Sequence, residues 1–432
     1  MTRAFVLHVD LREPDAPEPD AALAEAVSLT HAIELSVVDA DTASLAQPNP
    51  ATLLGPGKVR QLGELFAELE IELVIVNGTL SPVQQRNLER AWSVKVLDRT
   101  GLILEIFGAR AQTREGVLQV ELAHLTYQKS RLVRSWTHLE RQRGGTGFLG
   151  GPGETQIEAD RRMIDEKITR IRRQLEKVVR TRALHRKQRR RVPHPVVALV
   201  GYTNAGKSTL FNRLTASEVQ AEDMLFATLD PTMRKLRLPS GRVAILSDTV
   251  GFISNLPTQL VAAFRATLEE VLEADCIVHV RDVSHPATEA QARDVLAVLE
   301  ELGVDLARRD GMLEVHNKID LLPEGRAAEI VTATEGAHRV ALSAATGENC
   351  AALIDAIEER VYPRRLSFEL RLGHESGSAV GWLYRHGDVR DRRDEAEGVF
   401  LQVELTEREF FQFRKEFPDG VDVRRQQAVA AQ

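Results

Sequence analysis

Over residues 3–100, hydrophobic positions alternate between short apolar runs and stretches with helical spacing. Apolar runs typical of buried strands lie at Phe5–Val9, Leu35–Val38, Leu73–Asn77 and Val94–Leu97. Between the last two runs, Pro82–Trp92 has helical periodicity, and Ser81 is in the position of its N-cap. This alternation predicts a small parallel α/β layer.

A Gly-Pro-Gly-Lys segment at 55–58 has the composition of a phosphate loop. It lacks the spacing of such a loop, and no clear strand precedes it. We therefore favour a turn that opens the helix Val59–Leu69 over a nucleotide site.

Residues 102–139 are mostly compatible with helix, and Leu118, Leu122 and Leu125 share one face. Six glycines and a proline in Arg141–Glu154 predict a flexible loop. A long helix is expected from Ile157. Its coiled-coil seam consists of Ile164, Ile168, Ile171, Leu175 and Val178. The simplest arrangement is an antiparallel helical hairpin whose arms the glycine-rich loop connects.

The other faces of the second helix are strongly basic. The residues concerned are Arg161, Arg162, Lys167, Arg170, Arg172, Arg173, Lys177 and Arg180. Charges of this kind usually form a solvated face, but Glu176 is the one acidic residue between Lys167 and Arg191. This imbalance favours contact with a phosphate backbone. The run Arg186–Arg191 fits either a linker or a further RNA contact.

Beyond Tyr362-Pro363 the pattern changes to that of a small α+β domain. Leu366–Leu372 and Val399–Leu405 alternate like strands, and Thr406–Glu409 is a capping box for the helix Glu409–Phe417. We expect three phenylalanines, Phe410, Phe411 and Phe413, to belong to its core.

At 432 residues the chain is too long for one ordinary core. We expect an α/β multidomain protein with an N-terminal parallel α/β domain (1–110), a helical hairpin (111–192), a P-loop domain (193–362) and a small α+β domain (363–432). Cys276 and Cys350 are isolated, which indicates a reducing compartment. We find no signal peptide and no apolar run that would span a bilayer, so we expect a cytoplasmic monomer.

The segment Gly201–Thr209, GYTNAGKST, follows the apolar run Val196–Val200 and precedes a helical pattern. Strand, glycine-rich turn and helix are the context of a P-loop, whose amides point at phosphate oxygens. Lys207 is expected to neutralise the β- and γ-phosphates, and the Ser208 hydroxyl to ligate Mg²⁺.

Further nucleotide motifs follow in order. Thr228 in LFATLDPTM is expected to ligate Mg²⁺ and sense the γ-phosphate, with Thr232 as the alternative. Asp248, at the tip of the strand Val243–Leu246, is placed to hold Mg²⁺ through water, and the Gly251 amide to contact the γ-phosphate. We assign catalytic roles to Lys207, Thr228 and Gly251.

The motif Asn317-Lys318-Ile319-Asp320 indicates guanine. The Asp320 carboxylate can accept hydrogen bonds from guanine N1–H and N2–H₂, whereas adenine would leave it unsatisfied. Asn317 is expected to tie this loop to the P-loop, Lys318 to cover the ring, and the Ser343-Ala344 backbone to meet guanine O6. The predicted ligand is GTP or GDP. Its predicted contacts are Gly201, Tyr202, Thr203, Asn204, Ala205, Gly206, Lys207, Ser208, Thr209, Phe226, Ala227, Thr228, Asp248, Thr249, Val250, Gly251, Asn317, Lys318, Asp320, Ser343 and Ala344.

Two residues bear on hydrolysis. Phe252 stands where Ras-type enzymes place a Gln that orients the attacking water, so intrinsic hydrolysis is expected to be slow unless another group holds the water. The Asn204 carbonyl lies where it could coordinate a monovalent cation, and we hypothesise K⁺-assisted hydrolysis.

Taken together, GYTNAGKSTLFN, LFATLDPT, DTVGFI, LPTQLVAAFRATLEE and NKID resemble the HflX family of translational GTPases. So do DRTGLILEIF, EGVLQVELAHL and RQRGGTGFLGGPGETQIEADRR. The resemblance covers roughly residues 51–350. It implies a cytoplasmic GTPase that binds the large ribosomal subunit and splits stalled or idle ribosomes under stress, with the hairpin near the peptidyl-transferase region. It also implies ATP binding by the N-terminal domain, for which the residues give little support. His285 stands where the family usually has an acidic residue.

We therefore predict a ribosome-associated GTPase that grips rRNA through the basic hairpin and glycine-rich loop in its GTP state. Binding of that state would part the subunits, and hydrolysis would recycle the factor. One alternative is a GTPase that assembles the large subunit. Another, which Phe252 keeps open, is a non-enzymatic RNA-binding scaffold with structural GTP.

Overall fold

The computed structural model describes most of the chain. The described residues are 2–12, 18–33, 35–142, 152–189, 194–215, 232–254, 270–304, 312–334, 338–363, 365–395, 398–418 and 421–425. They divide into two compact units, Met1–Leu353 and Ile354–Gln432. No helix in these ranges is both long and apolar enough to cross a membrane.

The N-terminal part of the first unit is a parallel sheet with helices, as the alternating pattern predicted. Its strands are β1 (Arg3–Asp10), β2 (Ser36–Ser44), β3 (Leu73–Asn77) and β4 (Lys95–Asp98). They lie in the order β2-β1-β3-β4, all parallel. The helices are α1 (Pro19–His31), α2 (Pro56–Glu68), α3 (Pro82–Trp92) and α4 (Arg99–Arg110).

Two local predictions in this region are confirmed. Ser81 and Gln84 form a capping box at the start of α3, because each side chain bonds to the other residue's backbone amide. The Gly-Pro-Gly-Lys segment opens α2: Gly55 is the N-cap and Pro56 the first helical residue.

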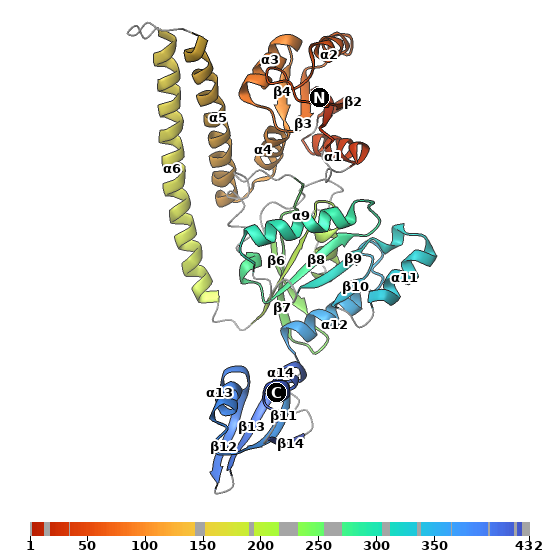
Figure 1. The fold of residues 1–432 in the computed structure, drawn as a ribbon, viewed down its shortest axis with the longest axis vertical. Helices are drawn as coiled ribbons and strands as arrows, with labels where there is room; N and C mark the ends of the chain where they lie inside the picture. The colour runs from red at the N-terminus through yellow and green to blue at the C-terminus, as the bar shows by residue number, and fades with distance from the viewer. Residues whose placement is uncertain are drawn as a thin grey trace. The chain divides into compact units, whose positions relative to one another are not determined.

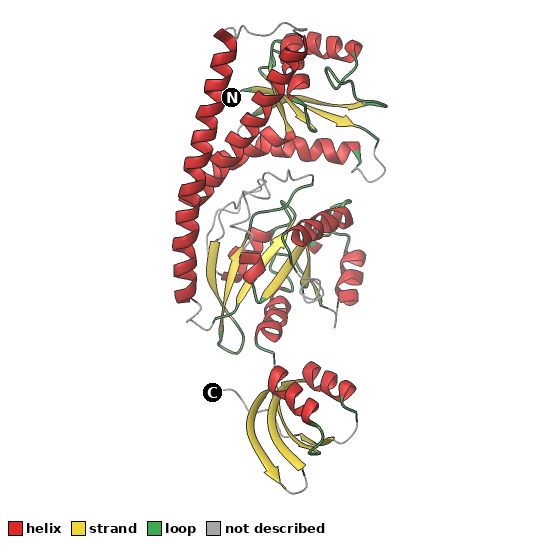
Figure 2. Ribbon diagram, turned by 60° about the vertical axis from the view of Figure 1, so that its left-hand side comes forward, coloured by secondary structure: helices red, strands yellow, loops and turns green. Residues whose placement is uncertain are grey.

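The hairpin consists of α5 (Arg114–Gln142) and α6 (Pro152–Arg189), which run side by side (Figures 1 and 2). Leu118, Leu125, Ile168 and Ile171 form its buried seam, as predicted. Residues 102–139 do not form one helix, because Thr113 caps α5 by accepting a hydrogen bond from the Gly116 amide at 3.0 Å. Helix α6 begins at Pro152, five residues before the predicted start. The predicted glycine-rich loop Arg141–Glu154 was too long at both ends, because residues 141–142 belong to α5 and residues 152–154 to α6; its middle, 143–151, lies outside the described residues.

The P-loop domain contains a six-stranded sheet in the order β10-β9-β8-β5-β7-β6. All neighbours are parallel except β6 and β7. The strands are β5 (Val196–Gly201), β6 (Thr232–Arg237), β7 (Val243–Asp248), β8 (Cys276–Asp282), β9 (Leu313–Asn317) and β10 (Arg339–Ala341). The described helices are α7 (Lys207–Thr215), α9 (Thr288–Glu301), η1 (Ile319–Leu321), α11 (Glu324–Thr334) and α12 (Cys350–Val361), of which α12 crosses the boundary between the two units.

The second unit contains an antiparallel sheet in the order β12-β13-β11-β14. Its elements are β11 (Arg365–Leu372), α13 (Gly377–His386), β12 (Asp388–Glu395), β13 (Gly398–Thr406), α14 (Glu407–Glu416) and β14 (Val421–Arg425). The prediction missed β12 because this edge strand is almost entirely charged. It also missed β14.

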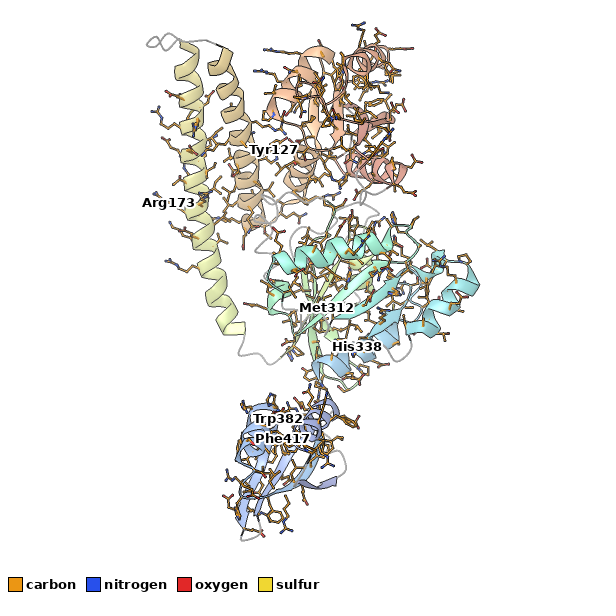
Figure 3. All side chains as sticks on the ribbon, viewed as in Figure 1. Tyr127, Arg173, Met312, His338, Trp382 and Phe417 are labelled. Atoms are coloured by element: carbon orange, nitrogen blue, oxygen red, sulfur yellow. The ribbon has the colours of Figure 1, made fainter. Side chains whose placement is uncertain are left out.

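The capping box of Thr406 and Glu409 is present. Phe413 is fully buried between Trp382 and Phe417, two residues that lie close together in this unit (Figure 3). Phe410 stacks on Phe368. The expectation for Phe411 was wrong: its ring is 72% exposed, because successive residues of a helix face different directions.

Candidate functional site

The turn between β5 and α7 has a backbone path that requires glycine at two positions. Gly201 has φ +154°, and a Cβ there would lie 2.2 Å from the Val280 carbonyl oxygen. Gly206 has φ +91°, and a Cβ there would lie 2.2 Å from the Asn317 side-chain nitrogen. Asn204, at the exposed outer part of the turn, has φ +58°. The segment therefore has the left-handed turns expected of a phosphate-binding loop.

Lys207 begins α7 and is buried beneath this turn. Its Nζ donates to the carbonyl oxygens of Gly201 at 3.0 Å and Tyr202 at 2.7 Å. Burial lowers the pKa of Lys207 to about 8, although the Asp248 carboxylate opposes this shift. A buried ammonium held by two carbonyls is suited to an anionic ligand, which would stabilise its charge.

Ser208 and Asp248 bring oxygen ligands together from α7 and the end of β7. The Ser208 hydroxyl donates to the Asp248 carboxylate at 2.7 Å, and Asp248 is 1% exposed. Hydroxyl and carboxylate oxygens suit Mg²⁺, which typically takes one or two protein ligands together with phosphate oxygens and water. The Thr249 hydroxyl instead donates to the Leu199 carbonyl at 2.6 Å, so this side chain supports the sheet.

Gly251 and Phe252 lie directly against the P-loop. A Cβ on Gly251 would lie 2.8 Å from Thr203 Cγ2 and 3.1 Å from Lys207 Nζ. The Thr203 amide donates to the Phe252 carbonyl at 2.7 Å, and the Phe252 amide donates to the Gly201 carbonyl at 3.1 Å. The Phe252 ring is 2% exposed and belongs to a hydrophobic cluster, so it does not orient water.

The loop after β9 is joined to the P-loop by Asn317. Its side-chain nitrogen donates to the Ala205 carbonyl at 2.7 Å, and its side-chain oxygen accepts from the Ala344 backbone amide at 2.9 Å. Lys318 has φ +67° and pairs with Asp282 at 2.8 Å. Asp320 lies in the short helix η1 and is exposed.

The Ser343 amide donates to the Glu348 carbonyl at 3.1 Å, and the Ala344 amide donates to the Asn317 side-chain oxygen at 2.9 Å. Both amides therefore have partners inside the protein in this conformation, and their contact with guanine O6 stays a prediction.

Three predicted contacts, Phe226, Ala227 and Thr228, lie outside the described residues. Thr232, the alternative to Thr228, begins β6 and pairs with Asp248 in the strand register. Two further predicted contacts, Thr209 and Val250, lie in α7 and just after β7.

Sequence reasoning missed a polar cluster behind the P-loop. Glu25 of α1 and Ser254 bond to the Tyr202 hydroxyl there, and Arg99 of α4 bonds to Glu25 and Ser254. The one sequence feature that could have indicated this cluster is the charged pair Asp98-Arg99, which directly follows the predicted strand Val94–Leu97. The cluster brings side chains of the N-terminal sheet domain into contact with the P-loop.

The site defines a P-loop GTPase domain. It combines a strand, a glycine-rich turn, a buried lysine, a Ser–Asp pair and an Asn-Lys-x-Asp loop. Family models match in sequence along the chain: "GTP-binding GTPase N-terminal" over residues 20–108 and "GTP-binding GTPase Middle Region" over 110–189. "50S ribosome-binding GTPase" matches 196–318, and "HflX C-terminal domain" matches 329–426. The chain belongs to the HflX family of GTPases, and it binds and hydrolyses GTP.

Individual relatives agree. The chain is 51% identical over 383 residues to GTPase HflX of Magnetococcus marinus, covering 89% of this chain and 88% of that protein. It is 42% identical over 401 residues to GTPase HflX of Escherichia coli, covering 93% of each. A crystal structure of a GTP-binding protein from Sulfolobus solfataricus in complex with GDP aligns with 84% of this chain and 99% of that chain, at 24% identity and a TM-score of 0.46.

Proposed function

We propose that the protein uses GTP to control binding to the large ribosomal subunit and that its GTP state splits stalled or idle ribosomes. The observation that carries this proposal is a basic helix face in a chain whose GTPase domain matches the ribosome-binding model. On α6, the side chains of Arg161, Arg162, Lys167, Arg170, Arg172, Arg173, Lys177 and Arg180 are all exposed. Arg173 lies on the outer side of this helix (Figure 3).

The chemistry assigned to each residue follows from its surroundings. Lys207 would neutralise the β- and γ-phosphates, and Gly251 would donate its amide to the γ-phosphate. Ser208 and Asp248 would hold Mg²⁺, which when bound offsets charge on the phosphate oxygens. Asp320 would accept hydrogen bonds from guanine. Since the Phe252 ring is packed in the core, we expect slow hydrolysis by the protein alone and stimulation when the ribosome supplies the group that orients water.

Sedimentation of intact ribosomes tests the proposal. Whole ribosomes are mixed with the protein and GTP, GDP, ATP or a non-hydrolysable GTP analogue, and free subunits are measured on a gradient. We expect splitting with GTP and with the analogue, and none with GDP or ATP. If splitting requires GTP hydrolysis, the proposal that binding of the GTP state alone separates the subunits is wrong. Preferential binding to incomplete large subunits would favour an assembly factor instead.

A charge reversal tests the role of the hairpin. Arg170→Glu together with Arg173→Glu should weaken ribosome binding at least about tenfold, because each lost phosphate contact removes counterion release. The control is Arg60→Glu on the exposed surface of α2. Equal binding by the two variants would show that α6 does not contact rRNA.

Asn204 supports a separate prediction about the monovalent ion. Its exposed side chain lies at the turn beside the proposed β- and γ-phosphate positions. We expect faster GTP turnover in K⁺ than in Na⁺ and loss of the difference in Asn204→Ala. Equal wild-type rates in the two salts would contradict the proposal.

A further inference from the structure

The cluster behind the P-loop joins the N-terminal sheet domain to the segment after Asp248. Arg99 Nη2 donates to the Glu25 carboxylate at 3.0 Å and to the Ser254 carbonyl at 3.2 Å. The Tyr202 hydroxyl bonds to Glu25, and the Ser254 amide donates to the Tyr202 hydroxyl oxygen at 2.8 Å. We refer to Glu25, Arg99, Tyr202 and Ser254 as the Glu25 cluster.

The Glu25 cluster is largely buried and contains one positive and one negative charge. Arg99 and Tyr202 are 8% and 7% exposed, and the Glu25 side chain is 19% exposed. Burial beside Glu25 raises the pKa of Tyr202, so the phenol keeps its proton and can donate to the carboxylate. Hydrogen bonds to ionised groups in such surroundings are among the stronger ones in proteins.

The cluster is anchored on the N-terminal side. Arg99 Nη1 donates to the Asn77 side-chain oxygen at 2.8 Å, and the Asn77 nitrogen donates to the Ala22 carbonyl at 3.0 Å. Asn77 therefore links α1 to the end of β3 and holds Arg99 in place. Arg99, one of the partners of Ser254, is therefore fixed by the N-terminal domain.

Ser254 lies three residues after Gly251, and the segment between them is held at both ends. Phe252 makes backbone hydrogen bonds to Gly201 and Thr203, and the Glu25 cluster holds Ser254. The Gly251 amide therefore has little freedom relative to Lys207. A hydrogen-bond donor that is already in position loses less entropy when a ligand binds.

We propose that Glu25 and Arg99 are positioning residues for γ-phosphate recognition: they hold Ser254, and through it they hold the Gly251 amide where the terminal phosphate binds. This inference rests on the proposed role of Gly251. GDP has no γ-phosphate, so the cluster acts on the affinity for the triphosphate and not on that for the diphosphate.

The test measures affinities of the full chain for GDP and for a non-hydrolysable GTP analogue, without ribosomes. Glu25→Ala should weaken analogue binding about three- to tenfold and leave GDP binding unchanged, the range expected for one or two net hydrogen bonds. Tyr202→Phe removes only the hydroxyl group and leaves the P-loop backbone, through which Tyr202 would contact phosphate, so it should have the same selective effect. The variant with both Glu25→Ala and Tyr202→Phe should lose less binding free energy for the analogue than the two single variants lose together, because both act through Ser254.

Glu25→Gln and Lys58→Ala are the controls. The amide of Glu25→Gln can still accept from Arg99, so it should restore part of the selectivity. Lys58 pairs with Asp41 elsewhere in the N-terminal domain, and Lys58→Ala should change neither affinity. If Glu25→Ala does not fold, Tyr202→Phe, which removes one hydroxyl group, carries the test.

Equal losses for both nucleotides, or no loss for either, would overturn the inference. Gly251→Ala separates this failure from failure of the site itself, because a Cβ there would lie against Thr203 and Lys207. We expect Gly251→Ala to weaken analogue binding much more than GDP binding, and its loss of GDP affinity measures how far the P-loop itself is disturbed. If it binds the analogue normally, the proposed role of Gly251 is wrong. If it loses analogue binding but Glu25→Ala does not, only the role of the cluster is wrong.

Discussion

At the carboxyl edge of the N-terminal sheet, Asn77 and Asp98 end β3 and β4 and bond to other parts of the protein. Asp98 accepts hydrogen bonds from the Gly101 amide at 2.8 Å and the Tyr127 hydroxyl at 2.6 Å, and it pairs with Arg131 at 2.6 Å. Tyr127 and Arg131 lie on α5, so this edge holds the hairpin.

The corresponding edge of the P-loop domain is built differently. Its central strand β5 ends in Gly201, which has no side chain, and the loop beyond exposes a left-handed turn. Asp248 and Asn317 end β7 and β9, and both contact residues of the P-loop or α7. The two sheets thus use the carboxyl edge of their parallel strands in two ways: one fills it with protein donors, and the other leaves room for a ligand.

The largest effect is expected on local stability when Asp98, at the carboxyl edge of the N-terminal sheet, is replaced by an uncharged residue. Asp98 is 1% exposed, and Asp98→Ala would remove the carboxylate that pairs with Arg131 and accepts from the Gly101 amide. We expect local stability to fall by about 3–5 kcal/mol, the cost of breaking a buried pair. Hydrogen exchange of the β3 and β4 amides measures this. Unchanged protection would show that the hairpin is held by other contacts.

A comparable loss is expected at the ligand-facing edge, but in affinity and not in stability. Asp320→Asn should reduce GTP affinity at least about 100-fold, because its side-chain oxygen can accept from guanine N1–H but its NH₂ group cannot accept from guanine N2–H₂. The same variant should gain affinity for xanthine nucleotides, whose position 2 carries an acceptor. Isothermal calorimetry with both nucleotides measures the switch. Unchanged preference for guanine would remove Asp320 from base recognition.

A smaller effect concerns protons. Burial lowers the pKa of Lys207 to about 8, and phosphate should raise it, so nucleotide binding near pH 8 should take up a proton. Above that pH, affinity should fall by up to about tenfold per pH unit as the empty site loses its ammonium. Calorimetry in two buffers with different ionisation enthalpies detects the uptake. Lys207→Arg, whose guanidinium stays charged, should show none.

The smallest effect is expected for an exposed carboxylate, Asp41, which serves as the control for the buried carboxylate Asp98. Lys58 and Asp41 form a pair with side chains 31% and 44% exposed. Asp41→Ala should change local stability by less than about 1 kcal/mol in the same exchange experiment. A loss as large as that of Asp98→Ala would mean that burial does not distinguish the two carboxylates.

Residues could be assigned from the sequence where their spacing along the chain follows a known motif or helical repeat. Gly201, Gly206 and Lys207 are constrained by the phosphate-loop turn, and the seam of the hairpin follows the helical repeat. The fold class and the GTPase assignment could therefore be predicted. The bond from Asn317 to Ala205 was expected as well, and the structure shows it.

The remaining features depend on contacts distant in sequence. Glu25 and Tyr202 are separated by 177 positions, and no local pattern marks that pairing. Strand β12 was missed because its charged residues pair across the sheet, as Arg390 does with Glu404. Phe411 was assigned to the core on residue type alone, whereas its position on α14 directs it to solvent.

Asn317 has a consequence for how this molecule can vary. Its side chain bonds to both the P-loop and the segment at Ala344, so it links the loop proposed to recognise the base to the loop proposed to surround the phosphates. Replacing Asn317 would therefore disturb both loops. Selectivity and turnover are therefore expected to change together when Asn317 is replaced.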